Sequence, residues 1–524
     1  MDTLAPAIEA PPLQRLEAGE VRPRSYALPA LLVGLVASAA ALRFASLGVQ
    51  SYHHDEVITA LRVLPGGLGH VLHEVVASES NPPLYYLLAW GWSQLFGLGE
   101  VGLRSLSALL GVALVPVAYL IGRELASRRA GVVLAAFAAF NPMLVWYSQE
   151  ARSYSLLVLL CALSFYFFLR ALEEARGRDL ALWALTSALA LCSHYFAFFP
   201  VAIEAVWLLV GLRVLWRLVL PALAAVGLVG AALLPLIAAQ TNPTHIGWIE
   251  GTPLVGRFFE TGASFLMGET GYVIAEPPRD HYALVPAVLL GLALLLVALR
   301  GDWRERRGAG IALALGLGVA TLAALAALLG KDYVVERNLL PVLLPLAAAA
   351  AIGCSLRSAR RVGAVLAVAV CLYWLAFGIY VTQTPNLQRP NFRALSQAIG
   401  PAQVPRAVVS WKLAADPVRL YLGGRVPRMY GGQGRVGEVD VVSKPLVAGQ
   451  PVNLPHSFRE VQRLRLDRLT LTRYVAKKPM ELTFPQLEAL PTGFGSNAIV
   501  LNGPYGWHVG PRVRTTSGQT GAGE

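Results

Sequence analysis

Apolar stretches of about twenty residues recur along most of the chain, and charged residues are almost absent from them. A hydrocarbon core roughly 30 Å thick needs about twenty apolar residues per helix, so each stretch is long enough to cross a membrane. The pattern predicts about eleven spans and a polytopic α-helical membrane protein. The spans cover residues 27–47, 103–122, 130–147, 154–172, 180–195, 196–213, 218–239, 283–300, 310–329, 338–355 and 362–381.

One further apolar segment, PPLYYLLAWGWSQLF at residues 82–96, is short and rich in aromatic residues. Tyr and Trp rings favour the membrane interface, so this segment is expected to be a helix lying along the outer surface. If it crossed, the arginine clusters after it would all face outward, against the usual charge bias.

Arginines set the expected orientation, because alternate connections between spans carry them and cytoplasmic loops are usually enriched in Arg and Lys. The N-terminal arm 1–26 is then cytoplasmic, and the membrane domain 27–381 presents long outer loops at 48–102 and 240–282. The chain is expected to be a multi-pass protein of the inner (plasma) membrane.

Hydropathy drops after the last span, and residues 382–514 are expected to form a mixed α/β domain. An odd number of crossings makes this domain extracytoplasmic. Its predicted helices are NFRALSQAI and DPVRLYL, and its predicted strands are RAVVSW, RLRLDRLTLTRYV and NAIVL. The tail 515–524 has the composition of a disordered segment.

Composition narrows the possible partners. The net charge is +12, but the arginines lie in short clusters between apolar spans, which is an orientation signal and not a nucleic-acid footprint. We therefore expect no nucleic-acid partner. All four cysteines fall inside apolar spans, with no disulfide framework or zinc spacing: Cys161, Cys192, Cys354 and Cys371.

The first outer loop opens with SYHHDEVITALRVL, which places Asp55 and Glu56 at the start of an amphipathic helix. A carboxylate held in a dry cleft can take the proton of an acceptor hydroxyl. The alternative is structural: Asp55 caps the helix and Glu56 interacts with the helix dipole. Adjacent His53 and His54 could hold a metal with Asp55, but no spaced set of three ligands is present.

Two further polar clusters lie at predicted outer turns. The segment YSQEARSYS is too short to leave the interface, and ionisable groups there are candidates for a cleft facing the bundle interior. The segment KDYVVERN offers cations at the depth of a lipid phosphate, although snorkelling is an alternative. The residues singled out are Tyr147, Gln149, Glu150, Arg152 and Tyr154 in the first cluster and Lys331 and Arg337 in the second.

A tight outer hairpin, CSHYFAFFP, holds His194 and Tyr195, which could line the same cleft or be ordinary interface residues. Glu204 is a carboxylate inside a predicted span, which is costly unless it is paired or faces a cavity, so it is a secondary candidate.

Several segments together resemble the GT-C glycosyltransferases related to protein O-mannosyltransferases and lipid A aminoarabinose transferases. They are HHDE, SESNPPLYYLLAWGWSQLFG, LRSLSALLGVALVPVAYLIGRELASRR, NPMLVWYSQEARSYSLL, ERNLLPVLLPLA and PNFRALSQAI. The resemblance implies a GT-C fold and inverting transfer of a monosaccharide from a polyprenyl-phosphate donor to a hydroxyl acceptor. By this resemblance, Asp55 would take the place of the catalytic carboxylate and Glu56 would assist or orient it. The expected contacts of the donor phosphate are Arg152, Lys331 and Arg337. The residues expected to line the substrate cleft are His54, Tyr147, Gln149, Glu150, Tyr154, His194 and Tyr195.

The acceptor stays open among lipid, protein and glycan, and membrane lipids surround the site. No cofactor is expected; a divalent metal is conceivable but not favoured. Two other functions are alternatives: a transporter or lipid flippase, which would need charged residues near the bilayer midplane, and a lipid-linked oligosaccharide ligase, which would need a wider cleft.

Overall fold

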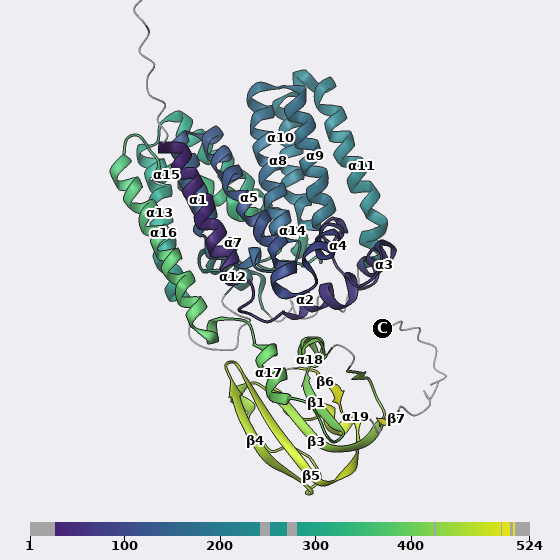
Figure 1. The fold of residues 1–524 in the computed structure, drawn as a ribbon. Helices are drawn as coiled ribbons and strands as arrows, with labels where there is room; N and C mark the ends of the chain where they lie inside the picture. Colours follow the sequence, from purple (N-terminus) through teal and green to yellow (C-terminus); the bar gives the residue numbers. More distant parts are fainter. Residues whose placement is uncertain are drawn as a thin grey trace, which may run out of the picture.

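The computed structural model describes residues 27–240, 252–269, 280–423, 426–493, 495–503 and 507–508. The predictions of a cytoplasmic arm at 1–26 and a disordered tail at 515–524 fall outside these residues, as do parts of the loop 240–282. Two bodies are visible in Figure 1, a bundle of long helices and a smaller domain with a β-sheet beneath one end of it.

Each predicted span coincides with a helix or with a pair of helices. The bundle consists of α1 (Ala27–Phe44), α5 (Glu100–Leu125), α6 (Arg128–Phe140), α7 (Pro142–Ser148), α8 (Tyr154–Glu174), α9 (Gly177–Ser193), α10 (Phe198–Gly211), α11 (Trp216–Gln240), α13 (Asp280–Arg300), α14 (Trp303–Leu328), α15 (Leu340–Cys354) and α16 (Arg360–Gln383). Among the described residues, seven helices are long and apolar enough to cross a membrane, or eight if α6 and α7 are one span. The number of eleven crossings and their orientation remain predictions.

The predicted continuous span 130–147 is wrong in detail, because α6 and α7 meet at a bend of 55°. Pro142 lacks an N–H and so cannot continue the hydrogen-bond ladder. The Arg43 guanidinium donates instead to the carbonyls of Ala138 (2.8 Å) and Ala139 (3.0 Å). Asn141 caps α7 by accepting from the Leu144 N–H, and the bend turns α7 toward the end of the bundle.

Short helices gather at the end of the bundle that faces the sheet domain (Figure 1). The predicted outer loop 48–102 folds into α2 (His54–Ile58), a π-helical turn (Thr59–Val63), α3 (Leu68–Ser78) and α4 (Leu84–Phe96). α4 is the aromatic segment expected at the interface, and it is too short for a span. A further helix, α12 (Leu254–Met267), packs against α7 and α13 at the same end.

The C-terminal domain is a mixed α/β domain, as predicted. Its described strands are β1 (Arg406–Trp411), β2 (Arg428–Met429), β3 (Gln433–Ser443), β4 (Phe458–Leu466), β5 (Leu469–Thr483), β6 (Asn497–Asn502) and β7 (Trp507–His508). They pair in the order β2-β6-β1-β3-β5-β4, with β7 beside β3, and β1 runs parallel to β3. The central strand β3 was not predicted, because its apolar residues are interrupted by charged ones.

The predicted single strand RLRLDRLTLTRYV is wrong: it forms parts of two antiparallel strands, β4 and β5. Leu466 pairs with Leu469, so Asp467 and Arg468 form a two-residue hairpin turn. Asp467 has a φ of 51°, a conformation that Asp tolerates better than most residues. Apolar and polar residues alternate on both sides of this turn, so the two strands look like one in the sequence.

Helices α17 (Phe392–Ile399) and α18 (Ala415–Tyr421) cover one face of the sheet and lie between it and the bundle (Figure 1). Phe392, Leu395 and Val418 pack there against β1 and β3 residues such as Val408. The domain is fastened to the first loop, since the Tyr421 hydroxyl accepts from the Tyr52 N–H at 2.7 Å. It is thus positioned next to the short helices that carry the candidate chemistry.

Candidate functional site

Asp55, in α2, faces Arg337, which lies just before α15. The Arg337 Nη1 is 3.5 Å from the Asp55 Oδ2, and the Asp55 side chain retains 24% of its exposure. Burial by itself raises the pKa of Asp55, but the charges of Arg337 and Arg152 outweigh it and hold that pKa well below its usual range. Asp55 is therefore an ionised and accessible carboxylate beside a fixed cation.

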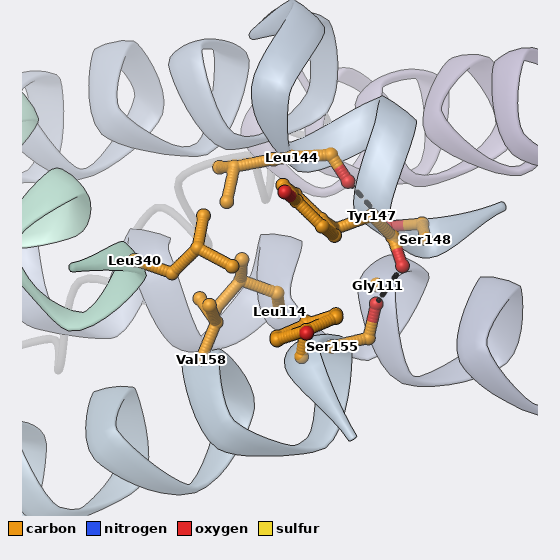
Figure 2. Close-up of a pocket in the computed structure, with 9 residues that line it drawn as sticks. Gly111, Leu114, Leu144, Tyr147, Ser148, Ser155, Val158 and Leu340 are labelled. Carbon is orange, nitrogen blue, oxygen red and sulfur yellow. Dashed lines mark hydrogen bonds between the residues drawn. The ribbon is translucent and has the colours of Figure 1, made fainter. Parts of the chain in front are cut away.

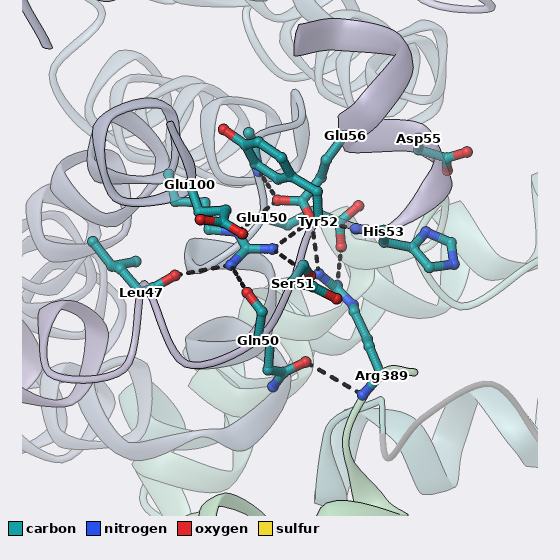
Figure 3. A network of polar contacts seen from close by, with 12 residues as sticks. Leu47, Gln50, Ser51, Tyr52, His53, Asp55, Glu56, Glu100, Glu150 and Arg389 are labelled. Atoms are coloured by element: carbon teal, nitrogen blue, oxygen red, sulfur yellow. Dashed lines mark hydrogen bonds and ion pairs between the residues drawn. The ribbon is translucent and has the colours of Figure 1, made fainter. Parts of the chain in front are cut away.

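Glu56, the next residue, points the other way, into the protein (Figure 3). Its carboxylate forms a bidentate pair with Arg104 of α5, with two contacts of 2.7 Å. It also accepts from the N–H of His53 at 3.0 Å, which caps α2, and from the N–H of Ala151 at 2.9 Å. Burial opposes ionisation, but the Arg104 charge lowers the pKa of Glu56. The adjacent carboxylates thus have different environments: Glu56 anchors α2, and Asp55 faces outward.

Arg152 lies beside Asp55 but is itself held by other groups. Its Nη1 donates to Glu79 at 2.8 Å and to Thr59 at 3.1 Å, with a longer contact of 3.4 Å to the Asp55 carbonyl. The guanidinium also lies over the Tyr86 ring, 5.7 Å from its centre. Arg152 is consequently buried and bonded inside the protein, whereas Arg337 is nearer to the surface.

Glu150 is paired with a residue from outside the bundle. Its carboxylate bonds to Arg389, in the connector between α16 and α17, and Arg389 also lies 3.4 Å from Glu56. Burial raises the pKa of Glu150 to about 7, Arg389 opposes this rise, and the nearby carboxylates of Glu56, Glu269 and Asp55 add to it. Glu150 therefore lies close enough to Asp55 for the charges of the two carboxylates to interact.

Aromatic side chains continue the cluster toward the bundle interior. The Tyr147 hydroxyl donates to Glu269 at 2.6 Å, and the rings of Tyr147 and Tyr154 are 4.8 Å apart. The Tyr154 ring in turn lies 5.9 Å from that of His194. Tyr147 and Tyr154 line a small cavity with apolar residues of α5, α8 and α15, with room for about one water molecule (Figure 2).

His194 and Tyr195 have partners of their own. His194 Nδ1 accepts from the Phe196 N–H at 3.1 Å. The His194 side chain is buried. The Tyr195 hydroxyl donates to Gln240, whose amide bonds in turn to the Asn81 carbonyl.

Three predicted site residues contribute less directly. Gln149 donates to the carbonyls of Leu42 and Arg43 and so satisfies the end of α1. Lys331 is exposed, and its neighbour Asp332 pairs with Arg257 of α12. His54 is half-buried next to Asp55, and its Nδ1 is buried without a hydrogen-bond partner among the described residues.

The described residues include no group of three or more His, Cys, Asp or Glu arranged to hold a metal.

Glu204, the carboxylate inside α10, is fully buried. Its Oε2 accepts from Trp183 at 2.8 Å and from Ser164. Glu204 lines a second small cavity with α8, α14 and α15, and its Oε1 has no hydrogen-bond partner within the described part of the chain.

Sequence reasoning missed Arg104, Glu79, Glu269 and Arg389. Arg104 carried a usable signal, because a cation inside a predicted span requires a buried partner. Glu79 lies in the SESNPP segment but had no distinguishing feature there. Arg389 belongs to a connector after the last span, and only the docking of the C-terminal domain brings it to Glu150.

A family model described as dolichyl-phosphate-mannose-protein mannosyltransferase matches residues 80–238. This range includes Arg104, Glu150 and Arg152 and stops short of Arg337. No curated protein sequence matches the chain.

Solved structures resemble the chain at low sequence identity. ArnT from Cupriavidus metallidurans, solved bound to undecaprenyl phosphate, is 14% identical; the match covers 86% of this chain and 99% of ArnT, with a TM-score of 0.50. The oligosaccharyltransferase AglB from Archaeoglobus fulgidus, solved with an inhibitory peptide and a dolichol-phosphate, is 14% identical over 71% of this chain, with a TM-score of 0.46. The chain spans 57% of the length of AglB.

The match with ArnT covers 86% of this chain, which is more than the helix bundle alone contains, so it extends into the C-terminal domain. At this identity it shows a common fold and says nothing of a common substrate. Over residues 80–238 the chain is therefore similar to the dolichyl-phosphate-mannose-protein mannosyltransferase family, and its fold, that of a polytopic helical membrane protein with a C-terminal α/β domain, is similar to that of ArnT.

Proposed function

We propose that this chain transfers a monosaccharide from a polyprenyl-phosphate donor to a hydroxyl group of an acceptor, with inversion at the anomeric carbon. The reaction takes place at the end of the bundle that carries α2 and the C-terminal domain, on the extracytoplasmic side of the inner (plasma) membrane. The observation that carries the proposal is the ionised, partly exposed Asp55 beside Arg337.

Asp55 acts as the general base. As the acceptor oxygen bonds to the anomeric carbon, its hydroxyl becomes more acidic and passes its proton to the Asp55 carboxylate. The bond from the same carbon to the phosphate oxygen breaks on the opposite face, and polyprenyl phosphate leaves with the electron pair. A carboxylate that is ionised before substrate binds is ready for this step.

Arg337 stabilises the departing phosphate. A guanidinium matches phosphate geometry and offers donors whose position does not change as charge develops on the leaving group. When the phosphate occupies Arg337, the ion pair with Asp55 weakens, and burial then raises the affinity of Asp55 for a proton. Donor binding in this way makes Asp55 a stronger base.

The other members of the cluster support these two groups. Arg152 is held by Glu79 and lends its charge to Asp55, while Glu56 fixes α2 through Arg104. Tyr147, Tyr154 and His194 lead from the charged cluster into the apolar interior, which suits a donor with a charged head and a long apolar tail. Lys331 is exposed and is at most a peripheral contact of the phosphate.

The test uses purified protein in lipid nanodiscs, incubated with a panel of radiolabelled polyprenyl-phosphate sugars and membrane extract as the source of acceptor. Asp55→Asn is expected to lower the transfer rate by about 10²–10⁴-fold. The matched control is Glu173→Gln, an exposed carboxylate at the end of α8. Equal rates in wild type and Asp55→Asn would remove Asp55 as the base, and failure of wild type to consume any such donor would refute the reaction class.

A further inference from the structure

Arg389 reaches the candidate site from outside the helix bundle. It lies in the connector between α16 and α17, yet its side chain is only 9% exposed. One end of the guanidinium bonds to Glu150, and the other lies 3.4 Å from Glu56 (Figure 3). Its centre also lies 4.7 Å from the centre of the Trp146 ring, which covers one face of it. A long cationic side chain is thus immobilised on three sides.

The backbone around Arg389 is fastened to the loop that precedes Asp55. The Arg389 N–H donates to the Gln50 side chain at 3.3 Å. Ser51 bridges the following residues, because its hydroxyl donates to the Pro390 carbonyl at 3.1 Å and accepts from the Phe392 N–H at 3.0 Å. The connector therefore has a fixed register against the first loop, and the position of Arg389 is set independently of its ion pairs.

The two carboxylates that Arg389 joins belong to the two segments that carry the proposed chemistry. Glu56 is the neighbour of Asp55 in α2, and Glu150 lies two residues before Arg152. Glu56 already links these segments once, by accepting from the Ala151 N–H. Arg389 links them a second time, through a charge that offsets both carboxylates. Without it, Glu56 and Glu150 would repel each other in a buried environment.

We propose that Arg389 is a positioning residue for sugar transfer: by bridging Glu56 and Glu150 it fixes α2 and the turn 149–153, so that Asp55 and Arg152 keep their relative placement. This inference rests on the proposed function. It makes the connector to the C-terminal domain a part of the active site, because the domain's docking carries Arg389 to these carboxylates.

A direct contact between Arg389 and the donor phosphate is the competing role. The N–H donors of Arg389 are engaged by two carboxylates, and the Trp146 ring covers one face of its guanidinium. Arg337 is about twice as exposed, at 19% against 9% for Arg389. Positioning and phosphate binding differ in kinetics. Loss of a positioning group lowers kcat, whereas loss of a ground-state phosphate contact raises KM for the donor.

The chain offers a matched control in Arg393, which lies four residues further on at the same interface. Arg393 pairs with Glu100 and bonds to the Gly48 carbonyl, and its side chain is 35% exposed. Arg389→Gln is expected to lower kcat by roughly 10–100-fold and to leave KM for the polyprenyl-phosphate sugar within about threefold. Arg393→Gln should leave both constants near wild type, and Arg389→Lys should recover part of the lost kcat.

A second measurement does not depend on activity. Backbone hydrogen exchange in nanodiscs should become about tenfold faster in residues 54–58 and 149–153 of Arg389→Gln and should not change there in Arg393→Gln. Unchanged exchange in both segments, or a raised KM with wild-type kcat, would overturn the positioning role. Wild type that consumes no donor would instead refute the proposed function, and the exchange comparison would still decide whether Arg389 holds the two segments.

Discussion

Asp55 and Arg337 lie 3.5 Å apart although one opens the first loop and the other precedes the tenth predicted span. Their pairing helps to keep Asp55 ionised, since Arg337 together with Arg152 outweighs the effect of burial on the pKa of Asp55. It also places a phosphate-binding group next to a base.

Arg337→Gln should weaken donor binding and change the pH dependence in a defined direction. Loss of a charge-assisted contact to phosphate is expected to raise KM by roughly 10–100-fold. Because Arg337 lowers the pKa of Asp55, its removal raises that pKa, and the acid limb of the kcat/KM profile should shift to higher pH. Steady-state kinetics across pH 4–8 measure both effects; an unchanged KM would remove Arg337 from the phosphate site.

Glu56→Gln should destabilise the fold. The side chains of Glu56 and Arg104 are 0% and 2% exposed, and removing one partner of a buried ion pair costs roughly 3–5 kcal/mol. The control is Glu100→Gln, whose partly exposed pair with Arg393 is expected to contribute about 1 kcal/mol or less. Thermal unfolding in detergent compares the two variants. Equal melting temperatures would contradict the role of Glu56 as the anchor of α2.

The pair of Glu150 and Arg389 predicts opposite pH trends for activity and stability. Since the pKa of Glu150 is raised to about 7, the ion pair forms as pH rises through 7, and kcat should increase over that range. The folded chain holds this proton more tightly than the unfolded chain, whose ordinary value is 4.5. The stabilisation of the folded state by the proton on Glu150 is therefore complete below pH 4.5 and is lost as pH rises through 7.

Glu150→Gln tests both trends at once. It should flatten the kcat profile between pH 5.5 and 8.5 and remove the loss of melting temperature that wild type shows as pH rises from 4.5 to 7. Glu173→Gln, exposed and remote in sequence, serves as the control for the general effect of losing a carboxylate. A kcat profile in Glu150→Gln that still rises through pH 7 would assign the titration to another group.

Glu204 distinguishes the enzyme from a transporter. Glu204→Gln should leave sugar transfer within about twofold of wild type, because its carboxylate bonds to Trp183 and Ser164 inside the bundle and not to the charged cluster. A buried carboxylate in a span is the kind of group a proton-coupled transporter requires. Proton-dependent uptake of a lipid or solute into proteoliposomes that this substitution abolishes would favour the transporter.

Much of the fold could be predicted because hydropathy is a local property. The positions of the helices, the aromatic helix α4 and the elements α17, β1 and β6 all follow from residues within each segment. The errors arose where the residues before and after a bend or turn have the same kind of hydrophobic pattern. Pro142 and Arg43 bend one predicted span, and Asp467 turns one predicted strand into a hairpin.

By itself, the sequence determined that the chain is a polytopic membrane protein with polar residues gathered at one end, and it singled out Asp55, Glu150 and Arg337 as candidate site residues. Only the tertiary structure decided which cation meets which carboxylate. The sequence does not distinguish Asp55 from Glu56, but α2 turns Glu56 toward Arg104 and leaves Asp55 for Arg337. The ion pair of Arg389 with Glu150 depends on the docking of the C-terminal domain. The physical reason is that burial and ion pairing depend on contacts between residues distant in sequence, which a local pattern does not contain.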